Sequence, residues 1–148
     1  MNALEFRVYG TPAPQGSKRH VGNGLMVESS KKVKPWRQDV VAAAIEAAEQ
    51  TPDFTPFIGP VKIRVEFVFT RPKAHYGTGR NADVLKLSAP RWVDKKPDID
   101  KLLRATFDAL STAGVWRDDN QAAQVFASKS YGDQPGALIH LESLPTTL

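Results

Sequence analysis

The 148-residue chain contains no cysteine. Without thiolates it can hold neither a disulfide framework nor a zinc ion bound through sulfur, and this absence is typical of a reducing compartment. The sequence also lacks any run of about 18 apolar residues, the length that a membrane-spanning helix needs. Residues 1–10 lack the basic and apolar regions of a signal peptide. We therefore expect a cytoplasmic protein that has no membrane partner.

Histidine is scarce as well. His20, His75 and His140 lie far apart without metal-ligand spacing, so we predict none of them as a ligand or a base. Basic residues, in contrast, outnumber acidic ones by 20 to 16. Many of them fall in two segments, the first with Lys18, Arg19, Lys31, Lys32, Lys34 and Arg37, the second with Arg71, Lys73, Arg80, Lys86, Arg91, Lys95 and Lys96. Basic loops are typical of nucleic-acid binding, but solvated surface loops have the same composition, so charge alone leaves both interpretations open.

The periodicity of apolar residues predicts an α+β fold. Alternation of apolar and polar residues indicates strands at residues 4–9 and 61–69. Residues 123–131 and 137–142 are interpreted as two further strands, and the turn GDQPG between them predicts a hairpin. Helical spacing indicates helices at residues 36–50 and from Asp98 to just before Gly114, separated by a long loop over residues 71–96. This order predicts a single domain over residues 1–148, with a mixed β-sheet packed by two main helices.

The same spacing predicts which helical residues face the core. In the first helix these are Val40, Val41, Ala44, Ile45 and Ala48; in the second they are Ile99, Leu102, Leu103, Phe107 and Leu110. Among the aromatic residues, we expect Trp36 and Trp116 in the core. Trp92, which lies within the basic loop, is the best candidate for stacking on DNA bases.

Two acidic pairs flank the second helix. Asp98 and Asp100 open it, and Asp118 and Asp119 follow it. The helix from Asp98 to about Leu110 is about 18 Å long. The five extended steps from Gly114 to Asp119 span about 17 Å, so if this segment reverses direction, it can bring Asp119 beside Asp98 and Asp100. A cluster of carboxylates without sulfur or paired histidines suits Mg²⁺ or Mn²⁺, and such ions support phosphodiester hydrolysis.

A purely structural interpretation of these acids is equally consistent with their spacing. Asp98 and Asp100 can be a helix cap and a first-turn acid, and Asp118 and Asp119 can be turn formers. Asp100, Arg104 and Asp108 are spaced by four and can form a solvated salt-bridged face. Spacing alone leaves the metal site and the structural role open.

The segment KPDIDKLLRATFDALSTAGVWRDDNQ, residues 96–121, resembles the signature of the RusA family of Holliday-junction resolvases. The shared features are a PDxD pair that opens a helix, an FDAL-like stretch, then a glycine, an aromatic residue and a DD pair before a strand. The resemblance implies a homodimeric, magnesium-dependent endonuclease, of a kind common in bacteria and their prophages, that resolves four-way DNA junctions by paired nicks.

The resemblance also implies roles for individual residues. The catalytic and metal-binding acids of the family fall on Asp98, Asp100 and Asp119. A catalytic lysine of the family falls on Arg104, and the residue after PDxD, usually asparagine, is Lys101. Because a guanidinium stays protonated, Arg104 cannot donate a proton and keeps only the electrostatic role of the family lysine. If the reaction needs a lysine amine, Lys101 is the nearby candidate. We expect Asp118 to play a supporting or structural role.

A two-fold dimer would present two equal sites to a junction of similar symmetry. We assign phosphate contacts to the basic residues Lys18, Arg19, Lys31, Lys32, Arg71, Lys73 and Arg80, and we expect no small-molecule cofactor. Three alternatives stay open. These are a nuclease that prefers flaps or forks, a catalytically silent protein that binds branched DNA, and an enzyme that acts on a small phosphorylated substrate.

Overall fold

The computed structural model describes residues 2–16, 18–20, 26–28 and 31–148, and of residues 18–20 and 26–28 it describes the backbone alone. The main elements are β1 (Ala3–Tyr9), α1 (Val33–Gln50), β4 (Val61–Phe69), α2 (Ile99–Ala113), β5 (Ala122–Tyr131) and β6 (Gly136–Ser143). The short strands β2 (Lys18–His20) and β3 (Met26–Glu28) pair with each other. Three 3₁₀ turns complete the list: η1 (Lys73–His75), η2 (Gly79–Asn81) and η3 (Asp119–Gln121).

The four long strands form one mixed sheet in the order β1-β6-β4-β5. β6 runs antiparallel to both β1 and β4, whereas β5 runs parallel to β4. β4 lies inside the sheet, and its Val61, Ile63, Val65 and Phe67 are fully buried. Strict alternation of apolar residues in β4 therefore places one complete face of this strand in the core. The predicted α+β class, the mixed sheet and the two packing helices are confirmed.

The predicted hairpin between the last two strands is wrong. β4 lies between β5 and β6, so the GDQPG segment crosses the end of β4 instead of joining neighbouring strands. Backbone hydrogen bonds hold this crossing in place: Gly132 N–H donates to the Phe69 carbonyl and Gly10 N–H donates to the Pro135 carbonyl. Gly136 starts β6 at φ +152°, where a Cβ would collide with the Val8 carbonyl oxygen.

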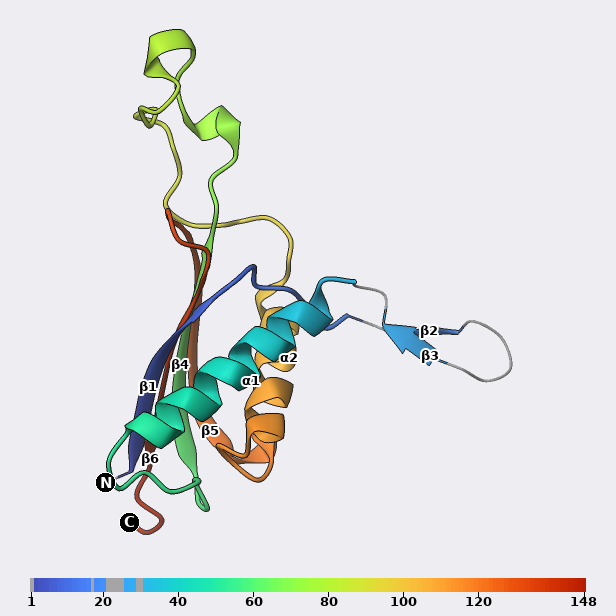
Figure 1. The fold of residues 1–148 in the computed structure, drawn as a ribbon, viewed down its shortest axis with the longest axis vertical. Helices are drawn as coiled ribbons and strands as arrows, with labels where there is room; N and C mark the ends of the chain where they lie inside the picture. Colours follow the sequence, from blue (N-terminus) through green and yellow to red (C-terminus); the bar gives the residue numbers. More distant parts are fainter. Residues whose placement is uncertain (1, 17, 21–25, 29–30) are drawn as a thin grey trace.

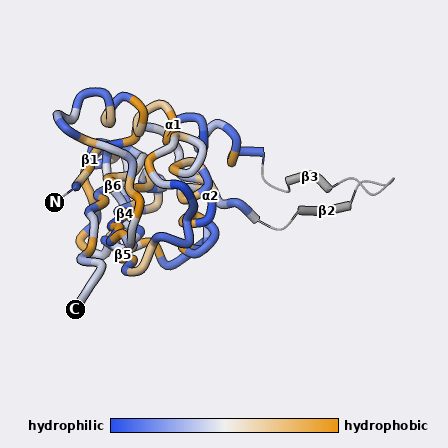
Figure 2. The backbone as a smooth tube through the Cα atoms, turned by 90° about the horizontal axis from the view of Figure 1, so that it is seen from below, coloured by the Kyte–Doolittle hydropathy of each residue, from blue (hydrophilic) through white to orange (hydrophobic). Residues whose placement is uncertain are grey.

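Both helices pack on the same face of the sheet (Figures 1 and 2). Trp36 and Trp116 are buried, as expected, and the Trp36 indole N–H donates to the Thr106 hydroxyl at 3.2 Å, which joins α1 to α2. No helix in the described part of the chain is both long and apolar enough to cross a membrane.

The predicted helical stripes need correction. Ile45 is exposed, Val41 is partly buried against the core, and the fully buried α1 residues are Val33, Trp36, Val40 and Ala44. In α2 the buried residues are Leu102, Ala105, Thr106, Ala109 and Leu110. Leu103 and Phe107 are partly buried beside this stripe.

The opposite face of the sheet carries no helix among the described residues and is polar. Lys62 and Glu142 form an ion pair at 3.5 Å on this face, and His140 Nδ1 lies 3.5 Å from a carboxylate oxygen of Glu5. The Arg64 guanidinium lies over the Phe126 ring, with its carbon 4.6 Å from the ring centre. We call this surface the open face.

The long loop predicted between β4 and α2 projects beyond the end of the sheet (Figure 1). It contains η1 and η2, and Tyr76 forms an isolated antiparallel bridge with Leu85. We call residues 71–90 the arm. Its described side chains are largely exposed, and Leu87 is fully exposed.

Candidate functional site

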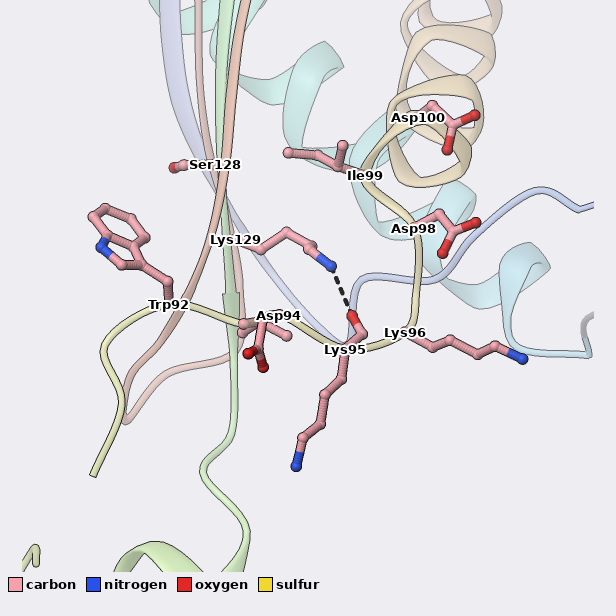
Figure 3. A pocket seen from close by; sticks show the side chains of 10 residues that line it. Trp92, Asp94, Lys95, Lys96, Asp98, Ile99, Asp100, Ser128 and Lys129 are labelled. Atoms are coloured by element: carbon pink, nitrogen blue, oxygen red, sulfur yellow. Dashed lines mark hydrogen bonds between the residues drawn. The ribbon is translucent and has the colours of Figure 1, made fainter. Parts of the chain in front are cut away.

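A cavity of ≈ 590 Å³ opens where the start of α2 meets the end of β5. It is lined by Trp92, Val93, Asp94, Lys95, Lys96, Asp98, Ile99, Asp100, Ser128 and Lys129. Three acids and three lysines therefore surround one opening, at the end of the sheet from which the arm projects (Figures 1 and 3). Such a mixture can hold a cation and a polyanion together.

The sheet and helix position this cavity through backbone contacts. The segment before α2 adds to the upper end of β5: Val93 N–H donates to the Lys129 carbonyl at 3.0 Å, and Tyr131 N–H donates to the Arg91 carbonyl at 3.0 Å. The Lys129 ammonium group donates to the Lys95 and Pro97 carbonyls at 2.7 and 2.8 Å. The Lys129 side chain therefore connects the segment just before Asp98 to β5 (Figure 3).

Asp98 and Asp100 project from the same side of the first turn of α2 (Figure 3). Asp98 occupies the N-cap position, but its side chain accepts no capping hydrogen bond within the described structure. The carboxylate instead lies 3.6 Å from the Lys101 ammonium group, and both side chains are about half exposed. The capping interpretation therefore does not account for Asp98, whose oxygens remain available for an external ligand.

The predicted salt-bridged face on α2 does not form. Among the described residues, Asp100, Arg104 and Asp108 make no ion pair with one another. Arg104 is exposed one turn beyond Asp100 and does not line the cavity. Lys101, in contrast, lies beside the site through its contact with Asp98.

Asp118 and Asp119 lie at the other end of α2, in and before η3. Asp118 caps this turn by accepting from Asn120 N–H at 3.0 Å, and that hydrogen bond lowers the pKa of Asp118, as does its contact with Asp119. The pKa of Asp119 is raised, mainly because partial burial disfavours its charged form. The hydrogen bond and negative charge of Asp118 and the negative charge of Asp108 raise this pKa further. Of the two neighbouring acids, Asp119 therefore holds a proton more readily than Asp118.

One chain does not bring the three predicted acids together. The reversed segment that returns toward Asp98 is β5, which begins after Asp119 rather than before it. Lys129 contacts Pro97, and the strand from Ala122 to Lys129 spans about 23 Å, so Asp119 lies far from Asp98 and Asp100. Accordingly, the described residues contain no group of three or more potential metal ligands.

The predicted phosphate-binding residues are spread over several elements. Lys73 and Arg80 are exposed on the arm, and Lys31 and Lys32 are exposed at the start of α1. Arg71 is partly buried at the base of the arm, with its guanidinium carbon 5.3 Å from the Tyr131 ring centre. Lys18 and Arg19 belong to β2, and their side chains lie outside the described structure. Trp92 is 54% exposed beside the cavity.

His75 lies at the base of the arm, where its ring meets the Tyr131 ring edge-on with centres 4.8 Å apart. Desolvation lowers the pKa of His75, and the positive charges of Arg71, Lys95 and Lys86 lower it further. The base of the arm is therefore electropositive, because Arg71, Lys95 and Lys86 all lie close enough to act on this imidazole.

Lys129 and Asp94 were not predicted from the sequence as site residues. Lys129 could have been found from the pattern of β5, because Val125, Ala127 and Lys129 alternate onto the face that the helices cover. A lysine on such a face needs a polar partner, and here the partners are two backbone carbonyls.

Comparison with known proteins identifies the family of the chain. Residues 9–142 match the family described as "Endodeoxyribonuclease RusA". The chain is also 29% identical over 137 residues to "Uncharacterized protein YqaN" of Bacillus subtilis (strain 168), covering 91% of this chain and 92% of that protein. Because the family match includes nearly the whole chain, with both acidic pairs, the cavity and the arm, the chain belongs to the RusA endodeoxyribonuclease family.

Proposed function

We propose that this protein resolves four-way DNA junctions by paired phosphodiester hydrolysis at the cavity beside α2. The observation that carries the proposal is the uncapped pair Asp98 and Asp100, which shares this cavity with Lys95, Lys96 and Lys129. Membership in a family of branched-DNA endonucleases supports the substrate class. The exposed basic side chains of the arm extend the positive surface beyond the cavity.

The donor set fits a magnesium ion. Mg²⁺ is commonly held by one or two carboxylates together with substrate phosphates and water, and Asp98 and Asp100 offer two carboxylates on one helical turn. A bound divalent cation would activate a water molecule and neutralise negative charge that develops at the phosphate. The Lys101 ammonium group lies 3.6 Å from the Asp98 carboxylate and is the candidate amine. Arg104 supplies a fixed positive charge toward the DNA backbone.

We further propose that Asp119 completes the site from the second protomer of a homodimer. Within one chain Asp119 lies at the opposite end of α2, so it cannot share a cation with Asp98 and Asp100 without a large rearrangement. A two-fold axis would supply two such composite sites, one for each nick.

A labelled four-way junction and its duplex arms, incubated with Mg²⁺, test the activity. The wild type is expected to produce paired nicks in the junction alone. Asp100→Asn should lower the nicking rate by at least about 100-fold, as expected for loss of a metal-binding carboxylate, while junction binding measured in Ca²⁺ persists. Glu49→Gln, an exposed acid on α1, serves as the matched control and should nick normally. Binding without nicking by the wild type would instead support the silent-binder alternative.

Purified heterodimers test the origin of Asp119. One protomer carries Asp100→Asn and the other carries Asp119→Asn. With a composite site, one of the two sites in each heterodimer is fully wild type, so single nicks without paired resolution are expected. If Asp119 acted within its own chain, both sites would be damaged and the heterodimer would not nick.

A further inference from the structure

The arm folds back on itself and has a defined shape of its own. Tyr76 and Leu85 form its antiparallel bridge. Backbone hydrogen bonds of 2.9 Å close the arm on both sides of this bridge, from Gly77 N–H to the Val84 carbonyl and from Lys86 N–H to the His75 carbonyl. At the base, the Arg71 guanidinium donates to the Pro90 carbonyl and so joins the two ends of the arm. Side chains on the arm are therefore held in place before any ligand binds.

The returning half of the arm exposes large apolar side chains. Leu87 is fully exposed, and Val84 and Leu85 are 57% and 46% exposed. We call these three residues the apolar strip. They lie outside the hydrophobic core and outside the set of residues that pack against it. Three aliphatic side chains that lie so close together and contribute nothing to folding indicate an interaction surface.

Basic residues surround the apolar strip. The arm holds four basic side chains against one acid, Asp83. Lys86 lies within the strip itself, and Lys73 and Arg80 are also exposed. This charge favours a polyanion as the partner, and the strip requires that the same polyanion offer an apolar surface. DNA meets both conditions where the faces of its bases are accessible.

The branch point is the part of a four-way junction that offers such faces. A linear duplex hides its base faces within a continuous stack, whereas an open junction exposes those of the base pairs that border the branch point. Proteins that open or bend DNA commonly insert leucine, isoleucine or other apolar side chains between bases. The arm also leads directly into Trp92, which lines the cavity, so both surfaces can reach one substrate (Figure 1).

Resting on the proposed junction-resolving function, we propose that the apolar strip inserts at the branch point and contacts exposed base faces. The basic residues around it contact the flanking phosphates. Phosphates are present in every DNA, whereas exposed base faces are specific to the branch point. The strip therefore sets the preference for a junction over a linear duplex, and the cations set the affinity for both. Contacts to bases release no counterions, so the strip leaves the salt dependence unchanged.

The double variant Val84→Thr/Leu87→Gln tests this assignment, because both side chains are exposed and the fold does not depend on them. Ile58→Gln is the matched control: Ile58 is 89% exposed and precedes β4, at the end of the sheet opposite the arm. Affinities for a labelled four-way junction and for a linear duplex are measured in Ca²⁺ at several salt concentrations. Melting temperatures should match the wild type in both variants.

We expect the double variant to lose about 10-fold in junction affinity, on the scale of burying one leucine side chain, with duplex affinity and salt slope unchanged. Ile58→Gln should bind both substrates as the wild type does. Lys86→Gln should weaken both substrates and lower the salt slope by about 0.9. A junction-to-duplex ratio in the double variant equal to that of the wild type would overturn the proposal.

Fluorescence of 2-aminopurine placed beside the branch point supplies an independent readout, because this base brightens when it is unstacked. Saturating wild-type protein should raise the signal at the branch point and leave it unchanged within a duplex arm. An equal rise with the double variant at saturation would contradict the insertion. Nicking by the wild type in Mg²⁺ tests the proposed activity separately. A wild type that nicks junctions, with binding that does not depend on the strip, would overturn this inference alone.

Discussion

At the scale of single residues, the cavity depends on a side chain that performs no chemistry. Lys129 binds two carbonyl oxygens of the segment that leads into Asp98, and so connects the sheet to the first turn of α2. Hydrogen bonds from a charged donor are stronger than those between neutral groups. Lys129 is therefore a positioning residue for the two proposed metal ligands.

We predict that Lys129→Met slows junction nicking about 10-fold or more while junction binding changes little. The substitution keeps the aliphatic part of the side chain but removes the donor that holds the Lys95 and Pro97 carbonyls. Weaker Mg²⁺ binding, measured by calorimetry, should accompany the loss, because the orientation of Asp98 is relaxed. Lys62→Met removes a lysine from the open face of the same sheet and should leave nicking unchanged. An equal decrease of the nicking rate in Lys129→Met and Lys62→Met would argue against a specific role for Lys129.

We predict a depressed pKa for His75 in an NMR titration. Desolvation disfavours the imidazolium, and Arg71, Lys95 and Lys86 repel it. Arg71→Gln should raise the pKa of His75, whereas Arg80→Gln, farther along the arm, should not. Because the folded state binds this proton less readily than the unfolded state, His75 lowers stability as the pH falls below about 6.5. An unchanged pKa in Arg71→Gln would show that this guanidinium does not act on the ring.

At the scale of elements, α1 and α2 are joined by one buried polar contact within an otherwise apolar interface. The Trp36 indole N–H donates to the Thr106 hydroxyl, and both side chains are fully buried. A buried donor that loses its acceptor carries the full cost of desolvation. The orientation of α2, and with it the start of the cavity, depends on this contact.

Thr106→Val should therefore lower the free energy of unfolding by about 1–3 kcal/mol in urea denaturation. The substitution keeps the shape of the side chain but leaves the indole N–H without an acceptor. In a Trp36→Phe background, the same substitution should lower the free energy of unfolding by less, because no indole N–H is left without an acceptor. Equal costs in the two backgrounds would assign the effect to packing rather than to the hydrogen bond.

At the scale of the whole molecule, the arm lies apart from the folded core. It extends beyond the sheet and contributes no residue to the buried core. Lys73, Arg80 and Lys86 are exposed along it. Their charge can therefore contact phosphates without a structural role in the domain.

Replacing these three residues with glutamine should weaken junction binding and reduce its dependence on salt. Each lost phosphate contact lowers the slope of log affinity against log salt by about 0.9, so three contacts lower it by up to about 2.7. The melting temperature should stay unchanged. Lys62→Gln, on the open face, is the control for a general loss of positive charge. An unaltered slope in the triple variant would exclude the arm as a phosphate-binding surface.

The sequence by itself determined the local structure and the family. Alternation of apolar residues identified β1 and β4, the turn residues between β5 and β6 marked those two strands, and helical spacing identified both helices, because these patterns report local geometry. The burial of Trp36 and Trp116 was also predictable from their flanking elements. The 26 residues from Lys96 to Gln121 were specific enough to indicate the RusA family, which the family match confirms.

Only the tertiary structure decided which elements are neighbours. The turn after β5 has the composition of a hairpin, yet β4 intervenes, because strand pairing depends on long-range packing that a turn does not encode. The separation of Asp119 from Asp98 and Asp100 has the same origin. Chain length permits their approach, but the buried Trp116 and the turn at η3 keep Asp119 at the far end of α2, and β5 alone returns to the cavity. Spacing limits what a chain can reach, whereas packing selects the arrangement it adopts.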